Sequence, residues 1–388
     1  MPKHNLGQYF TTNHSLKNIV YKFIKNKPNV ILEPSIGQGD LVEYVSLNMP
    51  DIVFDMYEID NTITLLNTID KNAIIYGDFL QQEILKIYKT IIGNPPYIRT
   101  KKGNLYIDFI EKCYNLLQDN GELIFIIPSD FFKLTSACKI INIMMNNGTF
   151  TNIYHPHNEQ LFKDANIDII VFRYCKNNTL AKQCIYNDKL LYIVNKNGLI
   201  TFTNDLNDKN IFFSIYFDIY VGLVSGLDSV YKNSKYGNID ILNSKDNTEK
   251  FIFLQEFPTT DNNINQYLLN NKDKLLNRKI KKFNNNNWHE WGAPRNLKII
   301  TQNLNKECIY IHNLTRKKEV AFIGKVQYFG GNLLMLLPKT NINLQKIVDY
   351  LNSSEFQSNF IFSNRFKIGQ KQLCDSYILS KYLSDNIM

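Results

Sequence analysis

The stretch IIGNPPYIR, residues 91–99, holds the groups with the clearest chemical use in this sequence. The Asn94 side chain offers one carbonyl acceptor and the Pro95 backbone offers a second. Pro95 and Pro96 fix two φ angles, so both acceptors lie on a rigid corner, and the Tyr97 ring adds a flat stacking surface. Two acceptors beside a stacking plane suit a planar group with an exocyclic NH2. They would draw electron density onto its nitrogen and aim the lone pair at an electrophile, without a covalent enzyme intermediate.

A second group of residues, upstream, suggests the electrophile. LEPSIGQGD, residues 32–40, reads as a strand followed by a loop with Gly37 and Gly39, where small residues let the backbone approach a ligand closely. Val42 stands where the dinucleotide fingerprint has its third glycine, a departure that is unsurprising if no pyrophosphate is bound. Glu58 follows Gly39 by 19 residues, at a strand end where an acid can accept from ribose hydroxyls.

Asp78 and Phe79 complete this set at the end of a third predicted strand. An acid beside an aromatic ring can bind an adenine amine and stack on its ring. Together with Glu58 and the glycine loop, these residues form an adenosine site that has no phosphate ligands. The combination points to S-adenosylmethionine as the cofactor. Its sulfonium is already activated, so we expect no metal.

Short β-branched runs alternate with helical patterns through the first half of the chain. The predicted strands are 29–34, 52–60, 73–79, 90–97, 122–128 and 167–174. Residues 105–121 carry apolar side chains at helical spacing, and this helix is predicted to stop at Gly121. The alternation predicts a mostly parallel sheet covered on both faces, with ligands at the carboxyl ends of the strands. The polar residues at those ends are Glu33, Glu58, Asp78 and Asn94.

The composition bounds the class of protein. A chain of 388 residues is too long for one ordinary core, and strand–helix alternation is lost after a polar stretch at 176–210. The net charge of +8 favours an anionic partner, with nucleic acid first. Six cysteines without CxxC pairing argue against zinc sites and disulfides. No apolar run approaches the ~18 residues of a membrane span, so we expect a cytoplasmic protein without a membrane segment.

Several motifs resemble those of the adenine-N6 DNA methyltransferases, type II restriction–modification methylases whose cofactor motifs come first and whose target-recognition domain comes last. The matching segments are LGQYFTT (6–12), ILEPSIGQGD (31–40), YEID (57–60), GDF (77–79), IIGNPPY (91–97), IFIIPSDFF (124–132) and QLFKDANIDIIVFRY (160–174). The resemblance implies an α/β, class I S-adenosylmethionine-dependent methyltransferase fold in residues 1–208, Rossmann-like, with a mostly parallel seven-stranded sheet. It implies a mixed α+β DNA-recognition domain in residues 209–388, where VGLVSGLDSVY and WGAPRN are weaker matches.

The same resemblance assigns roles to residues around an adenine that is swung out of double-stranded DNA. Asn94 and Pro95 would accept from its amine, while Tyr97 and Phe162 would hold its ring on the corner that Pro96 completes. The implied cofactor contacts are Thr11 (with Thr12 as the alternative), Glu33, Pro34, Gly37, Glu58, Ile59, Asp78, Phe79 and Asn94. The expected DNA contacts are Arg295, Lys325 and Arg365, with simple solvation as the alternative for both arginines.

The expected function is therefore methylation of adenine N6 in a short DNA sequence, by a monomer, which protects that sequence from a restriction endonuclease acting separately. Protein-glutamine methyltransferases are one alternative, because an amide NH2 presents the same donors, but their extra domain tends to precede the cofactor motifs. Ribosomal-RNA adenine methyltransferases are another. They share an N-terminus like LGQYFTT, but usually have an aliphatic residue where this chain has Pro95.

Three further classes fit less well. Carbon-5 cytosine methyltransferases attack through a cysteine that follows proline, and none of the eleven prolines here precedes a cysteine. Cytosine-N4 enzymes usually have serine in place of Asn94. A DNA-binding module without enzymatic activity would not need an adenosine site and an acceptor corner together.

Overall fold

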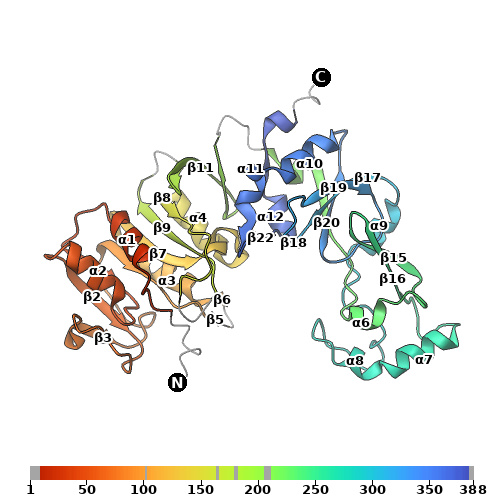
Figure 1. Cartoon of the computed structure of the whole chain (residues 1–388), viewed down its shortest axis with the longest axis horizontal. Coiled ribbons are helices and arrows are strands. Elements are labelled where there is room, and N and C mark those ends of the chain that lie inside the picture. Colours follow the sequence, from red (N-terminus) through yellow and green to blue (C-terminus); the bar gives the residue numbers. More distant parts are fainter. Residues whose placement is uncertain (1–8, 101–102, 163–165, 179–181, 205–210, 384–388) are drawn as a thin grey trace. The chain divides into compact units, whose positions relative to one another are not determined.

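The computed structural model describes residues 9–383, apart from 101–102, 163–165, 179–181 and 205–210 (Figure 1). The chain divides into two compact units. Unit 1 comprises residues 1–207 with 362–364, and unit 2 comprises residues 208–361 with 365–388.

Unit 1 is built on one ten-stranded sheet with the order β12-β11-β10-β8-β9-β7-β4-β1-β2-β3. Its strands are β1 (Val30–Glu33), β2 (Val53–Glu58), β3 (Ile74–Tyr76), β4 (Tyr88–Gly93), β7 (Leu117–Pro128), β8 (Gly148–Tyr154), β9 (Ile169–Lys176), β10 (Gln183–Tyr186), β11 (Lys189–Lys196) and β12 (Leu199–Thr203). The five strands β3-β2-β1-β4-β7 are all parallel, and β9 runs antiparallel to both β7 and β8. The predicted α/β fold with a mostly parallel seven-stranded sheet is confirmed, and β10–β12 extend that sheet by three strands.

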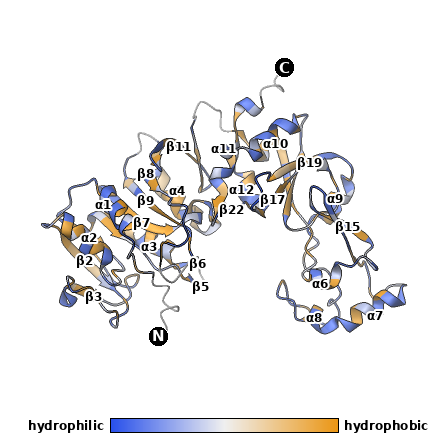
Figure 2. Cartoon of the chain, viewed as in Figure 1, coloured by the Kyte–Doolittle hydropathy of each residue, from blue (hydrophilic) through white to orange (hydrophobic). Residues whose placement is uncertain are grey.

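Helices cover both faces of this sheet. They are α1 (His14–Phe23), α2 (Asp40–Asn48), α3 (Leu105–Asn115) and α4 (Cys138–Asn146). Alternate side chains of β7 enter two cores, because successive residues of a strand point to opposite faces. Leu123, Phe125 and Ile127 pack with α3 and α4, whereas Ile124 and Ile126 pack with α1 and α2. Apolar residues accordingly fill the central strands in Figure 2.

Two boundaries in unit 1 differ from the sequence predictions. The helix predicted over 105–121 ends at Asn115, and residues 117–121 already belong to β7. A small β-ribbon of β5 (Arg99–Thr100) and β6 (Gly103–Asn104) lies between the NPPY corner and α3.

Unit 2 mixes antiparallel strands with short helices, as the predicted α+β class requires. Its largest sheet has the order β14-β20-β17-β19, formed by β14 (Phe217–Val221), β17 (Glu307–His312), β19 (Ala321–Lys325) and β20 (Leu333–Pro338). The smaller strands are β13 (Ile211–Phe212), β15 (Ile239–Ser244), β16 (Asn247–Phe251), β18 (Leu314–Thr315), β21 (Ile361–Phe362), β22 (Arg365–Lys367) and β23 (Tyr377–Ile378). The helices are α5 (Phe213–Tyr216), α6 (Asp228–Tyr231), α7 (Asn262–Asn270), α8 (Lys272–Leu276), α9 (Leu297–Gln302), α10 (Leu344–Asn352), α11 (Ser354–Gln357) and α12 (Gln370–Cys374).

Three further observations concern the thiols, possible metal sites and possible membrane spans. All six cysteines carry free thiols, and five of them are buried. Within the described residues, no group of three or more His, Cys, Asp or Glu side chains could hold a metal ion. No helix in that part of the chain is long and apolar enough to cross a membrane.

Candidate active site

A cavity that is partly open to solvent lies where the parallel strands of unit 1 end. Predicted site residues from four strand ends border it: Pro34 and Gly37 after β1, Glu58 and Ile59 at β2, Asp78 and Phe79 after β3, and Asn94 and Pro96 after β4. The structure therefore brings most of the predicted cofactor residues together with the NPPY corner.

Glu58 is fixed in this cavity by three backbone N–H donors. One carboxylate oxygen accepts from Gly37 at 2.9 Å, and the other accepts from Ile59 at 2.8 Å and Asp60 at 2.9 Å. Gly37 can donate because its φ of +59° is easily reached by glycine. Burial raises the pKa of Glu58, and the three backbone hydrogen bonds oppose that rise. The oxygen that accepts from Gly37 still has a lone pair with which to accept from a ligand's hydroxyl.

Asp78 and Phe79 form another part of the cavity wall. One oxygen of Asp78 accepts from the backbone N–H of Leu80 at 2.9 Å, so the carboxylate is held in a turn. No helix begins between Asp78 and β4, so Asp78 is not a helix N-cap. Phe79 is 2% exposed and stacks on Phe109, with ring centroids 5.5 Å apart. An acid and an aromatic ring are thus adjacent, as an adenine would require.

Glu33 and Thr11 are not among the residues that border the cavity, and their contact with the cofactor stays a prediction. Glu33 is 2% exposed and accepts from the backbone N–H of Ser35 at 3.1 Å. A Cβ at Gly93 would lie 3.0 Å from its carboxylate, so the acid is enclosed between β1 and β4. Burial raises the pKa of Glu33 to about 8.

The NPPY corner begins directly after β4 ends at Gly93. The side-chain nitrogen of Asn94 donates to the backbone carbonyl of Tyr9 at 2.7 Å and to the hydroxyl of Thr11 at 3.1 Å. The hydroxyl of Tyr97 donates to the side-chain oxygen of Asn94 at 2.5 Å. Burial keeps the pKa of Tyr97 well above its usual value, so it stays a neutral donor. In the described part of the chain, nothing donates to the Pro95 carbonyl.

Three aromatic rings gather beside this corner. Tyr9 stacks on Tyr97, with ring centroids 5.4 Å apart. Phe162 meets Tyr97 edge-on at 6.2 Å and lies 5.7 Å from Tyr9. Phe162 is also 4% exposed and belongs to the apolar core with α1 and α2. The structure thus brings Phe162 to Tyr97, and its packing in the core alone would also account for its burial.

Sequence reasoning missed Tyr9, Phe10 and Phe109 as residues of this cavity. The first two lie inside the quoted motif LGQYFTT, whose aromatic pair was the available signal. Phe109 was assigned only to the apolar face of a helix. In its case the helical pattern gave no sign of which core residue would also reach a ligand.

The three predicted DNA-contacting residues lie in unit 2 on different elements. Arg295 precedes α9, Lys325 ends β19 and Arg365 begins β22. The first two are exposed, and Arg365 is half-buried.

The sequence is similar to known restriction–modification methylases. Residues 55–162 match the family model described as Eco57I restriction-modification methylase. The chain is 25% identical to the Type II methyltransferase M.HindII of Haemophilus influenzae, over 90% of this chain and 84% of that protein. It is 32% identical to the Type II methyltransferase M.HincII of Haemophilus influenzae, over 48% of this chain and 40% of that protein. The chain thus spans most of the first relative and less than half of the second.

Two other proteins are also similar to this chain. One is named for a substrate other than DNA, and the other is a solved structure. The release factor glutamine methyltransferase of Flavobacterium psychrophilum is 25% identical over 46% of this chain and 61% of that protein. A nuclease-deletion mutant of the Type ISP restriction-modification enzyme LlaGI aligns with 86% of this chain and 42% of that chain, at 12% identity and a TM-score of 0.46. Because this score is below 0.5, the fold assignment rests on the strand order of unit 1.

Proposed function

This chain carries a restriction–modification methylase domain, and we propose that it is a DNA methyltransferase acting on the N6 amine of an adenine in a short sequence of double-stranded DNA, with S-adenosylmethionine as the methyl donor. One observation carries the proposal. The acceptor corner at Asn94 and the acids Glu58 and Asp78 border the same cavity. A base amine held at the corner and an adenosine held by the acids would therefore meet.

The residues of the cavity fit the cofactor. Glu58 would accept from the ribose hydroxyls, Asp78 from the adenine amine, and Phe79 would pack against the adenine ring. When bound, S-adenosylmethionine supplies a methyl group on a positively charged sulfonium. No phosphate-binding third glycine is needed, in keeping with Val42 at that position.

The chain's own part in the reaction is to orient an amine. Asn94 Oδ1 and the Pro95 carbonyl would each accept one N–H of the exocyclic NH2, which fixes the plane of the base. Tyr97 would stack against the ring, a contact worth about 1–3 kcal/mol for one base. Holding both reactants in place avoids the entropic cost of a bimolecular encounter.

Adenine is favoured over cytosine because the corner begins with Asn94 rather than serine. The similarity to a release factor glutamine methyltransferase makes a protein glutamine amide the second candidate. Ribosomal-RNA adenine is the third. We further propose that the protein acts as a cytoplasmic monomer, independently of any restriction endonuclease for the same site.

The test is methylation of duplex DNA by the purified chain with methyl-labelled S-adenosylmethionine, followed by mass spectrometry of the nucleosides. N6-methyladenine is the expected product, and Asn94→Ala should lower its rate by at least about 100-fold, as loss of a key hydrogen-bonding group does elsewhere. N4-methylcytosine would reassign the base. Label in a glutamine peptide or in ribosomal RNA, with none in DNA, would contradict the proposal.

A further inference from the structure

Thr11 is buried beside the proposed reaction centre without bordering the ligand cavity. Its side chain is 4% exposed, whereas its neighbours Tyr9 and Phe10 line the cavity. Its hydroxyl oxygen lies 3.1 Å from the side-chain nitrogen of Asn94 and accepts one of its two hydrogens. The other hydrogen goes to the Tyr9 backbone carbonyl at 2.7 Å. Both hydrogens of the amide are therefore engaged by one short segment.

The Tyr9 contact decides which way the carboxamide faces, and the Thr11 hydroxyl then accepts the second hydrogen of the amide. A backbone carbonyl can only accept, so the Asn94 nitrogen must point towards Tyr9 and the Asn94 oxygen must point away. The reversed amide would set two acceptor oxygens 2.7 Å apart. The Tyr97 hydroxyl does not decide the orientation, because a hydroxyl can donate to oxygen or accept from nitrogen.

We propose that Thr11 is a positioning residue: by accepting the second hydrogen of the Asn94 amide, it locks the orientation that the Tyr9 carbonyl sets, with the Asn94 oxygen turned towards the target amine. This inference rests on the proposed function for the identity of that amine, but the locked orientation itself does not. The cofactor contact expected for Thr11 stays a separate prediction. The segment 9–11 would then serve both reactants, the cofactor through the cavity wall and the base through Asn94.

The kinetic test compares Thr11→Val, which removes the acceptor at nearly constant volume, with Thr11→Ser, which keeps it. Thr11→Val should lower kcat about 10- to 100-fold, the scale of a small misplacement of a reacting group. The Kd and KM for S-adenosylmethionine should stay within twofold, and Thr11→Ser should restore kcat. Thr64→Val is the matched control, because Thr64 is exposed and outside the cavity.

Two kinetic results would overturn the inference. One is a kcat for Thr11→Val equal to that of Thr64→Val. The other is weaker S-adenosylmethionine binding at unchanged kcat, which would restore the cofactor contact. If Thr11→Val melts well below the wild type, Thr11→Ala removes the same acceptor without added volume.

A second measurement does not depend on DNA activity. In protein labelled with 15N-asparagine, the Asn94 side-chain signal is identified by its loss in Asn94→Ala. Both of its protons should exchange slowly in the wild type, and one should exchange at least tenfold faster in Thr11→Val. Equal exchange in the two proteins would refute the lock. If the wild type were inactive on DNA, the proposed function would be refuted. The exchange measurement would still test whether Thr11 locks the Asn94 side chain.

Discussion

The buried acid Glu33 should make the stability of unit 1 depend on pH. Its pKa is about 8 in the folded protein and 4.5 in the unfolded chain. Between these values the folded state binds the extra proton, so the free energy of unfolding falls as pH rises from 4.5 to 8. The loss is on the order of 5 kcal/mol at 1.36 kcal/mol for each unit of pKa. Glu33→Gln, which stays neutral, should remove this loss.

Urea unfolding of wild type and Glu33→Gln at pH 5 and at pH 8.5 checks this expectation. The variant should gain stability relative to the wild type at the higher pH. The difference in stability between the two proteins is the informative quantity, because Lys133 titrates in the same pH range and changes the stability in the opposite direction. Burial lowers the pKa of Lys133 to about 7, which makes its contribution rise with pH. A difference that is the same at both pH values would show that Glu33 does not hold the proton.

The residues at strand ends predicted where the cavity lies, but they did not predict which side chains border it. Glu33 and Glu58 both close a strand and were predicted alike, yet only Glu58 reaches the cavity. The difference is that Glu58 turns back to the N–H of Gly37, a long-range contact that no local pattern encodes. Thr11 and Asn94 are separated by 83 residues, so their hydrogen bond could not be predicted from spacing.

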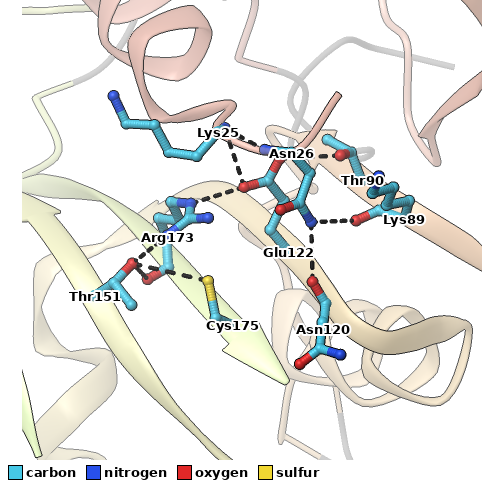
Figure 3. Close-up of polar contacts among 9 residues, drawn as sticks. All are labelled: Lys25, Asn26, Lys89, Thr90, Asn120, Glu122, Thr151, Arg173 and Cys175. Atoms are coloured by element: carbon cyan, nitrogen blue, oxygen red, sulfur yellow. Dashed lines mark hydrogen bonds and ion pairs between the residues drawn. The ribbon is translucent and has the colours of Figure 1, made fainter. Parts of the chain in front are cut away.

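At the level of elements, one buried carboxylate joins the end of α1 to the sheet (Figure 3). Glu122 on β7 accepts from the backbone N–H groups of Lys25 and Asn26, from Thr90 on β4 at 2.9 Å, and from Arg173 on β9 at 2.7 Å. Glu122 is 0% exposed and Arg173 is 8% exposed. Such a pair adds little net stability as a whole, but removal of one partner leaves a buried charge uncompensated.

Glu122→Ala should therefore lower the free energy of unfolding by roughly 3–5 kcal/mol. Glu111→Ala is the control, because its carboxylate is half exposed and lies 4.0 Å from the mostly exposed Lys139. A pair of that kind contributes about 0–1 kcal/mol. Chemical denaturation of both variants at one pH measures the contrast. Similar losses in the two would mean that solvent reaches Glu122.

The elements themselves were largely predictable, since apolar, β-branched runs of four to eight residues identify buried parallel strands. The boundary of α3 was not. Leu116 and Leu117 continue the helical spacing, but Leu117 pairs with Tyr88 of β4 and begins β7. A pairing partner 29 residues upstream therefore ended the helix, and periodicity within one segment carries no information on such partners. The join of β10 to β8, which extends the sheet, is hidden from the sequence for the same reason.

At the level of the whole molecule, the second unit remains a predicted DNA-recognition domain, and its charged residues offer a test. The logarithm of the DNA-binding constant falls linearly with the logarithm of the salt concentration. Each side chain that neutralises a phosphate adds about 0.9 to the steepness of that slope. Arg295 and Lys325 are exposed and Arg365 is half-buried. Replacing any one of these three residues with alanine should reduce the steepness of the slope by about one unit if that residue contacts the DNA phosphates.

The titration also separates two kinds of DNA contact that an arginine can make. An arginine that reads a base would change sequence preference, whereas one that contacts phosphate would weaken binding to all duplexes alike. Lys381→Ala is the matched control, because Lys381 is already paired with Glu355 at 3.0 Å. Slopes measured on specific and scrambled duplexes between low and moderate salt give both answers. If all three substitutions give the same slope and the same sequence preference as Lys381→Ala, DNA is recognised by other residues. The reason is that a protein that loses a phosphate contact must release fewer counterions on binding.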